Sequence, residues 1–178
     1  MELLASTTNA TAITLQDGLV FTDTFLTYEV LRGRLETIRC AIPKGHRVLD
    51  LLADARIKNW TVTEEESGQI VTVELVDGSS RTVSLEIHTE LDAENGAREL
   101  LGRTSDQTFG IHALDVVRES GVLSVRAAAE SELVIESSQG VARVAEGEVD
   151  ERIRRPGASY FRYFSPSTAR LSVSARPL

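Results

Sequence analysis

The chain has 178 residues, of which 42% are hydrophobic and 26% charged; this composition is typical of a folded globular protein and excludes a disordered one. The formal net charge of -8 and the sequence pI of about 5.0 argue against a nucleic-acid-binding surface, because affinity for phosphate comes largely from Lys and Arg. Cys40 is the single cysteine, which excludes an intramolecular disulfide and a Cys-x-x-Cys zinc or redox site.

The first residues lack the basic and apolar regions of a signal peptide. No apolar stretch approaches the roughly 18 residues that a membrane span needs, so we predict no membrane span in this segment. A strand-like run stops just before residues 176–178, which suggests a piece cut from a longer parent.

The start of the chain, residues 1–11, is predicted to be a loose lead-in, because residues 6–10 are small and polar. Residues 12–178 are predicted to form a single domain. Alternation of apolar and polar side chains predicts strands there, with Cys40 on the apolar face of the third. These first strands are expected at residues 13–16, 19–31 and 35–42.

Residues 48–55 allow two interpretations, since Val48, Leu51, Leu52 and Ala55 also fit the apolar stripe of a helix. The segment is short and has strand-like neighbours, so we predict a strand. A further strand is expected at residues 57–63.

The clearest alternating pattern flanks the turn residues Asp77 and Gly78. Residues 70–75 and 81–88 both have a period of two, and an Asp-Gly turn between two such runs is typical of a β-hairpin. We therefore predict that these two strands pair with each other.

Residues 92–107 break the pattern and are predicted to be a long excursion, at which the domain could also divide. Asp92 could start a helical turn there and Gly102 could stop it, although Asn95-Gly96 in its middle argues against one. A second short helical turn is expected around Val149 and Ile153. The remaining predicted strands are residues 108–117, 122–129, 132–137 and 141–144, and a closing hairpin of 160–164 with 169–175.

These elements together predict an all-β fold, an antiparallel β-sandwich of about a dozen strands with at most one or two short helical turns.

No catalytic residue, metal ligand or cofactor is predicted. The chain has no Gly-x-Ser-x-Gly, Walker or dinucleotide motif. The spacing of His46, His88 and His112 matches no metal motif such as His-Glu-x-x-His. Asp92, Glu94 and Asn95-Gly96 lack the spacing of an EF-hand, so a solvated loop is favoured over a calcium site. Cys40 is expected to be buried and inert.

The candidate ligand-binding residues are aromatic and basic: Trp60, Tyr160, Arg162 and Tyr163. Rings beside arginines can stack on sugars or bases. Alternation within residues 160–164 favours packing of about half of these rings in the core instead, with the acidic residues of 148–151 neutralising Arg152, Arg154 and Arg155.

Several landmarks resemble a β-sandwich segment of large, uncharacterised bacterial envelope or secreted proteins. They are residues 28–33, 42–50, 59–62 and 161–164, the last followed by 171–173. The resemblance implies an extracytoplasmic structural or interaction module with no catalytic residues.

Three functions follow as hypotheses. The first is a non-catalytic structural or protein-interaction module of a larger bacterial protein, with a protein partner or a second copy of itself. The second is a carbohydrate-binding module that uses Trp60 and the aromatic residues of 160–164. The third is a polysaccharide-active enzyme, which would need paired carboxylates or a His-bound metal.

Overall fold

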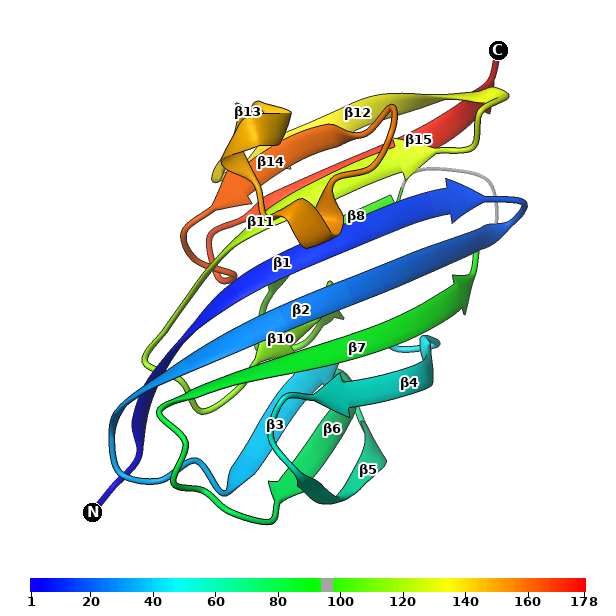
Figure 1. Cartoon of the computed structure of the whole chain (residues 1–178). Coiled ribbons are helices and arrows are strands. Elements are labelled where there is room, and N and C mark those ends of the chain that lie inside the picture. Colours follow the sequence, from blue (N-terminus) through cyan, green and yellow to red (C-terminus); the bar gives the residue numbers. More distant parts are fainter. Residues whose placement is uncertain (94–97) are drawn as a thin grey trace.

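The computed structural model describes residues 1–93 and 98–178, which form fifteen strands in three sheets and two short 3-10 turns (Figure 1). The predicted all-β sandwich class is confirmed.

The largest sheet has the strand order β13-β14-β11-β1-β2-β7-β4. Its centre is mixed, because β1 pairs antiparallel with β2 and parallel with β11; Thr11 lies between Thr24 and Leu123. The remaining pairs in this sheet are antiparallel. The bounds are β1 Leu4–Gln16, β2 Leu19–Arg32, β4 Arg47–Ala53, β7 Thr82–Asp92, β11 Arg118–Ala127, β13 Val141–Val144 and β14 Ser159–Tyr163.

The predicted loose lead-in at residues 1–11 is wrong, because β1 begins at Leu4 and occupies the middle of the largest sheet. The prediction failed because the side chains of this strand are small and polar, a composition that is typical of loops. Thr7, Asn9 and Thr11 are buried on the inner face of the sheet, and the hydroxyl of Thr11 donates to Oδ1 of Asn9 at 2.6 Å. A polar run is therefore part of the core here.

Two four-stranded sheets pack against one face of the largest sheet. One has the order β10-β3-β6-β5 and the other β12-β15-β8-β9. In Figure 1, β3, β5 and β6 lie at the lower end of the molecule and β12 and β15 at the upper end. The bounds are β3 Thr37–Ile42, β5 Ile57–Glu65, β6 Gly68–Leu75, β8 Arg98–Arg103, β9 Thr108–Phe109, β10 His112–Ala113, β12 Ser131–Gln139 and β15 Arg170–Pro177.

Both predicted hairpins are wrong, although their strands exist. β6 pairs with β3 and β5, whereas β7 pairs with β2 and β4 in the largest sheet. Likewise, β14 lies in the largest sheet and β15 beside β12 and β8. In both cases the chain crosses from one layer of the sandwich to the other at the turn.

The ambiguous residues 48–55 form strand β4, as predicted. The predicted excursion at 92–107 contains strand β8, which pairs with β15, so the described part of it has no helical turn. Glu94 and the Asn95-Gly96 pair fall at positions 94–97, outside the described residues. The short helical turn expected around Val149 and Ile153 is present as the 3-10 turns Glu146–Glu148 and Glu151–Ile153.

Two apolar clusters share the inner face of the largest sheet. One contains Leu85 and Val73 and lies under β10-β3-β6-β5; the other contains Leu171 and Val125 and lies under β12-β15-β8-β9. On the outer face, Phe25 and Tyr160 pack with Ile153 of the 3-10 turns in a third cluster. Because β2 contributes to both inner clusters, one sheet supports both halves of the sandwich.

Candidate functional site

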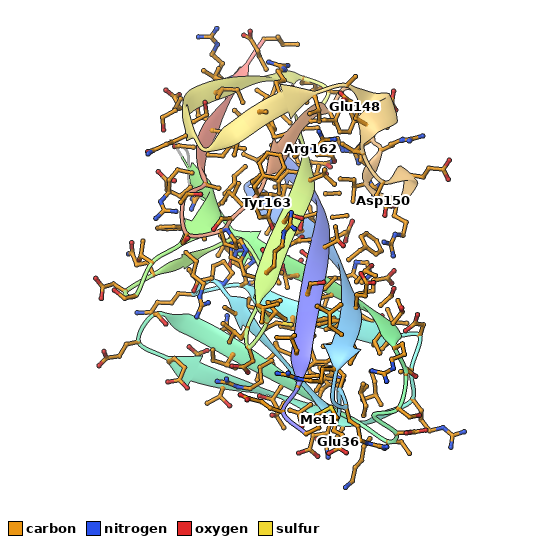
Figure 2. The ribbon with its side chains drawn as sticks, turned by 90° about the vertical axis from the view of Figure 1, so that its left-hand side faces the viewer. Met1, Glu36, Glu148, Asp150, Arg162 and Tyr163 are labelled. Carbon is orange, nitrogen blue, oxygen red and sulfur yellow. The ribbon has the colours of Figure 1, made fainter. Side chains whose placement is uncertain are left out.

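The predicted ligand-binding residues do not form one site. Tyr160 and Tyr163 are buried on β14, and Arg162 between them is half-buried. Trp60 lies on β5, which Figure 1 places at the opposite end of the molecule from β14. Figure 2 shows Arg162 and Tyr163 in the upper half of the molecule, away from Met1 and Glu36 at its lower end.

Tyr160 and Tyr163 have structural roles in the interior. The hydroxyl of Tyr160 donates to the carbonyl of Arg155 and accepts from its N–H, both at 3.0 Å, which fixes the second 3-10 turn on the sheet. The hydroxyl of Tyr163 donates to Oε2 of Glu119 at 2.6 Å. Neither ring is available to stack on a sugar.

The arginines in and just after the second 3-10 turn are bound by other groups of the protein. Arg152 pairs with Asp150 at 2.9 Å and lies 4.7 Å from the ring centre of Phe25. Arg155 lies 3.5 Å from Oδ2 of Asp23. These contacts agree with the packing interpretation rather than with a stacking surface.

Trp60 is the one predicted aromatic residue that remains partly accessible, with 38% of its surface exposed. It pairs with buried Val73 and so points to the inner side of its sheet. Since β5 is an edge strand, the sandwich is open there, and Trp60 borders a shallow hollow with Val48 and Val62.

Two titratable side chains in the lower half of the sandwich are neutral because they are buried. Burial raises the pKa of the Cys40 thiol to about 12, and its sulfur lies 3.4 Å from the hydroxyl of Tyr28. Burial lowers the pKa of His46 to about 4; its Nδ1 lies 3.1 Å from Oγ1 of Thr89. The prediction that Cys40 is buried is confirmed.

His88 lies on the outer face and behaves differently. Partial burial by itself lowers its pKa, but hydrogen bonds to the carboxylates of Asp23 at 2.5 Å and Glu86 at 3.0 Å outweigh this effect and raise it.

Glu119 is the centre of a buried polar network between the two apolar clusters. Besides the Tyr163 hydroxyl, its carboxylate accepts the N–H of Ala113 at 2.6 Å and lies 2.8 Å from Nδ1 of His112. The other ring nitrogen of His112 lies 2.7 Å from the carbonyl of Phe109, to which it must donate. The network joins β10, β11 and β14, so it holds one small sheet against the large one.

A groove of about 770 Å³ opens beside this network, where β8, β10, β11, β14 and β15 end. We call it the arginine groove, because Arg103, Arg118 and Arg170 line it. Val117 and Phe164 also line it, with 60% and 66% of their surfaces exposed. Sequence reasoning missed this site, since its residues come from strands far apart in the chain.

A second hollow of about 350 Å³ lies on the inner face between the two small sheets. Ile13, Val20 and Leu100 give it an apolar floor, and Lys44 and Glu66 are among the charged residues at its border. Charges of both signs surround it, so it favours no one class of ligand.

Within residues 1–93 and 98–178, no three His, Cys, Asp or Glu side chains are grouped so that they could hold a metal ion. In the same part of the chain, no helix is long and apolar enough to cross a membrane.

No family model matches the chain, and no curated protein matches it. Solved structures of peptidases match the chain. A yeast LTA4 hydrolase in complex with bestatin matches with a TM-score of 0.62 at 7% identity, over 96% of this chain and 28% of that one. An M1 zinc metallopeptidase from Deinococcus radiodurans matches with a TM-score of 0.56 at 15% identity, over 96% of this chain and 42% of that one.

This chain therefore spans less than half the length of the peptidases that it matches. The likeness, at such low identity, concerns the fold alone, which is similar to the N-terminal β domain of M1 peptidases. The described residues do not fit the zinc ion that the name of the Deinococcus enzyme includes, because they offer no cluster of ligands.

Proposed function

We propose that this chain is a non-catalytic β-sandwich module that binds a protein partner through the arginine groove. The observation that carries the proposal is the exposure of Phe164 and Val117 in a groove that three arginines also line. Aromatic residues and arginine are enriched at protein interfaces and supply most of the binding energy there. An exposed ring of this kind is otherwise costly, because its apolar surface stays in contact with water.

The fold comparison concerns only the module part of the proposal. In the peptidases this fold makes up 28 to 42% of the chain, so it shares the polypeptide with other parts. From the resemblance found in the sequence, we further propose that the module belongs to a larger bacterial envelope or secreted protein.

The carbohydrate-binding hypothesis has less support. Two of its four residues, Tyr160 and Tyr163, are buried and bonded inside the protein, and Trp60 stands alone at a distance from them. Sugar platforms need accessible aromatic faces, and Trp60 shows only 38% of its surface.

A photocrosslinking experiment tests the proposal. Phe164 is replaced by p-benzoylphenylalanine in the full-length protein, which is expressed in its native cells. Crosslinked peptides are then identified by mass spectrometry. We expect defined crosslinks to another protein, another domain or a second copy. The control places the same photoreactive residue at Leu31, which is also exposed but lies outside the groove. Equal, scattered crosslinks from both positions would show that the groove is not a docking surface.

A further inference from the structure

The arginine groove has a charge opposite to that of the molecule as a whole. The chain carries a formal net charge of -8, yet the groove is lined by Arg103, Arg118 and Arg170. Within the described residues, the single acidic residue that lines it is Glu119, whose buried carboxylate already accepts from Tyr163 and Ala113. The groove therefore presents positive charge without an accessible negative charge of its own.

The guanidinium groups of the three arginines retain N–H donors for hydrogen bonds to a ligand. None of the three forms an ion pair with a carboxylate in the described part of the chain. One nitrogen of Arg170, Nη1, donates to the carbonyls of Ala169 at 2.6 Å and Pro166 at 3.3 Å. A guanidinium has five N–H donors in a planar fork that matches a carboxylate, so donors remain for a ligand.

The position of Arg170 is fixed by its surroundings. Its side chain packs over Gly102, where a Cβ atom would come within 2.6 Å of the Ala169 carbonyl oxygen and would also meet the arginine itself. The N–H of Arg103 donates to the carbonyl of Pro166 at 3.0 Å, which fastens β8 to the loop between β14 and β15. A charge held in place costs less entropy when a ligand binds.

Three of the four hydroxyl groups that line the groove already have a partner within the protein; Ser105 is the fourth. Oγ of Ser165 lies 2.9 Å from Oγ of Ser167, and Oγ1 of Thr104 accepts the N–H of Gln107 at 3.0 Å. Recognition in the groove thus depends mainly on the guanidinium groups and on the apolar surfaces of Val117 and Phe164.

We infer that the arginine groove binds an acidic peptide segment of a protein partner, in which Asp or Glu side chains stand beside a large apolar side chain. The carboxylates pair with the guanidinium groups and the apolar side chain packs against Phe164 and Val117. Charge complementarity favours this occupant over a basic or neutral one. The inference rests on the proposed function and adds the chemistry of the partner.

Fluorescence anisotropy with two labelled peptides tests the inference on the complete 178-residue chain. The acidic probe is Gly-Asp-Glu-Leu-Glu-Phe-Asp-Glu-Gly; the neutral probe has Asn for each Asp and Gln for each Glu. We expect the acidic probe to bind at least about tenfold more tightly, and to weaken as salt is raised.

Three variants locate the binding. Arg103→Gln and Arg118→Gln should each weaken binding of the acidic probe by about fivefold or more, because each removes one charge-assisted hydrogen-bonding partner. Arg32→Gln is the matched control, since Arg32 is also exposed and does not line the groove, and it should leave the affinity unchanged. Circular dichroism verifies that all three fold.

Three results would overturn the inference: equal binding of the two peptides, no binding of either, or tighter binding of a labelled oligothymidine than of the acidic probe. The crosslink from position 164 reports docking whatever the charge of the partner. A defined crosslink together with no preference for the acidic probe would therefore reject the acidic segment and retain the docking surface.

Discussion

At the scale of single residues, Glu119 does the most to join the parts of the sandwich. Its carboxylate is buried and is bonded by side chains or backbone of β10 and β14. Removing a buried hydrogen-bond acceptor is costly because its donors are left without a partner in the interior. In this chain the Tyr163 hydroxyl and the Ala113 N–H would lose their acceptor, and His112, which is itself buried, would lose its neighbour.

We predict that Glu119→Ala lowers the free energy of unfolding by about 2 to 6 kcal/mol, because two buried donors are left unsatisfied at about 1 to 3 kcal/mol each. Denaturant-induced unfolding measures the change. Glu130→Ala serves as the control, because Glu130 is exposed on the surface and should change stability by less than about 0.5 kcal/mol. A loss of the same small size for Glu119→Ala would show that the network contributes little.

His46 predicts a dependence of stability on pH. Its pKa is about 4 in the folded protein because it is buried, and about 6.5 in the unfolded chain. Between these values the unfolded chain takes up a proton that the folded protein does not, so stability falls as the pH drops from about 6.5 to 4.

In His46→Gln, the loss of unfolding free energy that results from protonation of His46 in the unfolded chain should disappear. We expect the fall in unfolding free energy between pH 7 and pH 4.5 to be smaller in the variant by about 2 kcal/mol, as an order of magnitude. His88 has a raised pKa and acts in the opposite direction, which makes His88→Gln the control of opposite sign. Identical pH profiles for wild type and His46→Gln would contradict the assignment.

Cys40 should be unreactive in the folded protein. A thiol with a pKa of about 12 is protonated at pH 8, and only the thiolate reacts readily with a disulfide reagent. We predict no reaction with 5,5′-dithiobis(2-nitrobenzoate) at pH 8 in buffer and full reaction in guanidinium chloride. Rapid reaction of the native protein would place the thiol at the surface.

At the scale of elements, β8 shows how a backbone position supports the groove. Gly102 has φ of +125°, a value that side-chain-bearing residues rarely adopt, and it faces the carbonyl of Ala169 and the side chain of Arg170. Both the conformation and the contact require glycine at this position.

Gly102→Ala is therefore predicted to lower the free energy of unfolding by about 1 to 3 kcal/mol, as expected for strain at such a backbone position. Gly147→Ala is the matched control: nothing lies within 4 Å of a Cβ there and φ is not positive. Thermal or denaturant unfolding measures the stability of the two variants. Equal stability of Gly102→Ala and Gly147→Ala would contradict the prediction.

The strands themselves were largely predictable from sequence, and their partners were not. The alternation of Val71, Val73 and Leu75 correctly predicted which side chains are buried, because a period of two defines the faces of a strand. It does not specify the neighbour in the sheet. After Asp77-Gly78 the chain crosses to the opposite layer, where the apolar face of β7 meets the same cluster from the other side.

The candidate site was not predictable for a related reason. Arg103, Arg118 and Arg170 have no shared motif, and only the sheet topology brings the ends of β8, β11 and β15 to one groove. The predicted aromatic set failed because the outward side of β14 is also covered: Tyr160 packs against Ile153 of the 3-10 turn. A strand buried on both faces does not show simple alternation.

At the scale of the whole molecule, two apolar clusters depend on one continuous sheet. Leu85 belongs to one cluster and Leu171 to the other, and both are buried. Because β2 contributes Leu26 to the first cluster and Val20 to the second, loss of packing in either half should destabilise the entire chain.

We predict that Leu85→Ala and Leu171→Ala each lower the free energy of unfolding by about 2 to 5 kcal/mol. In both variants, Trp60 fluorescence and far-ultraviolet circular dichroism should report one coincident transition. Separate transitions of the two probes would show two independently folding halves.

The central claim is that the arginine groove docks an acidic segment of a protein, and crosslinking combined with charge reversal tests it most directly. The photoreactive residue at position 164 is introduced separately into the Arg103→Glu and Arg118→Glu variants. The crosslink yield of each is compared with that of an Arg32→Glu control that carries the same photoreactive residue. We predict a fall of about tenfold or more with the groove variants and an unchanged yield with the control. An equal yield in all three proteins would contradict the account.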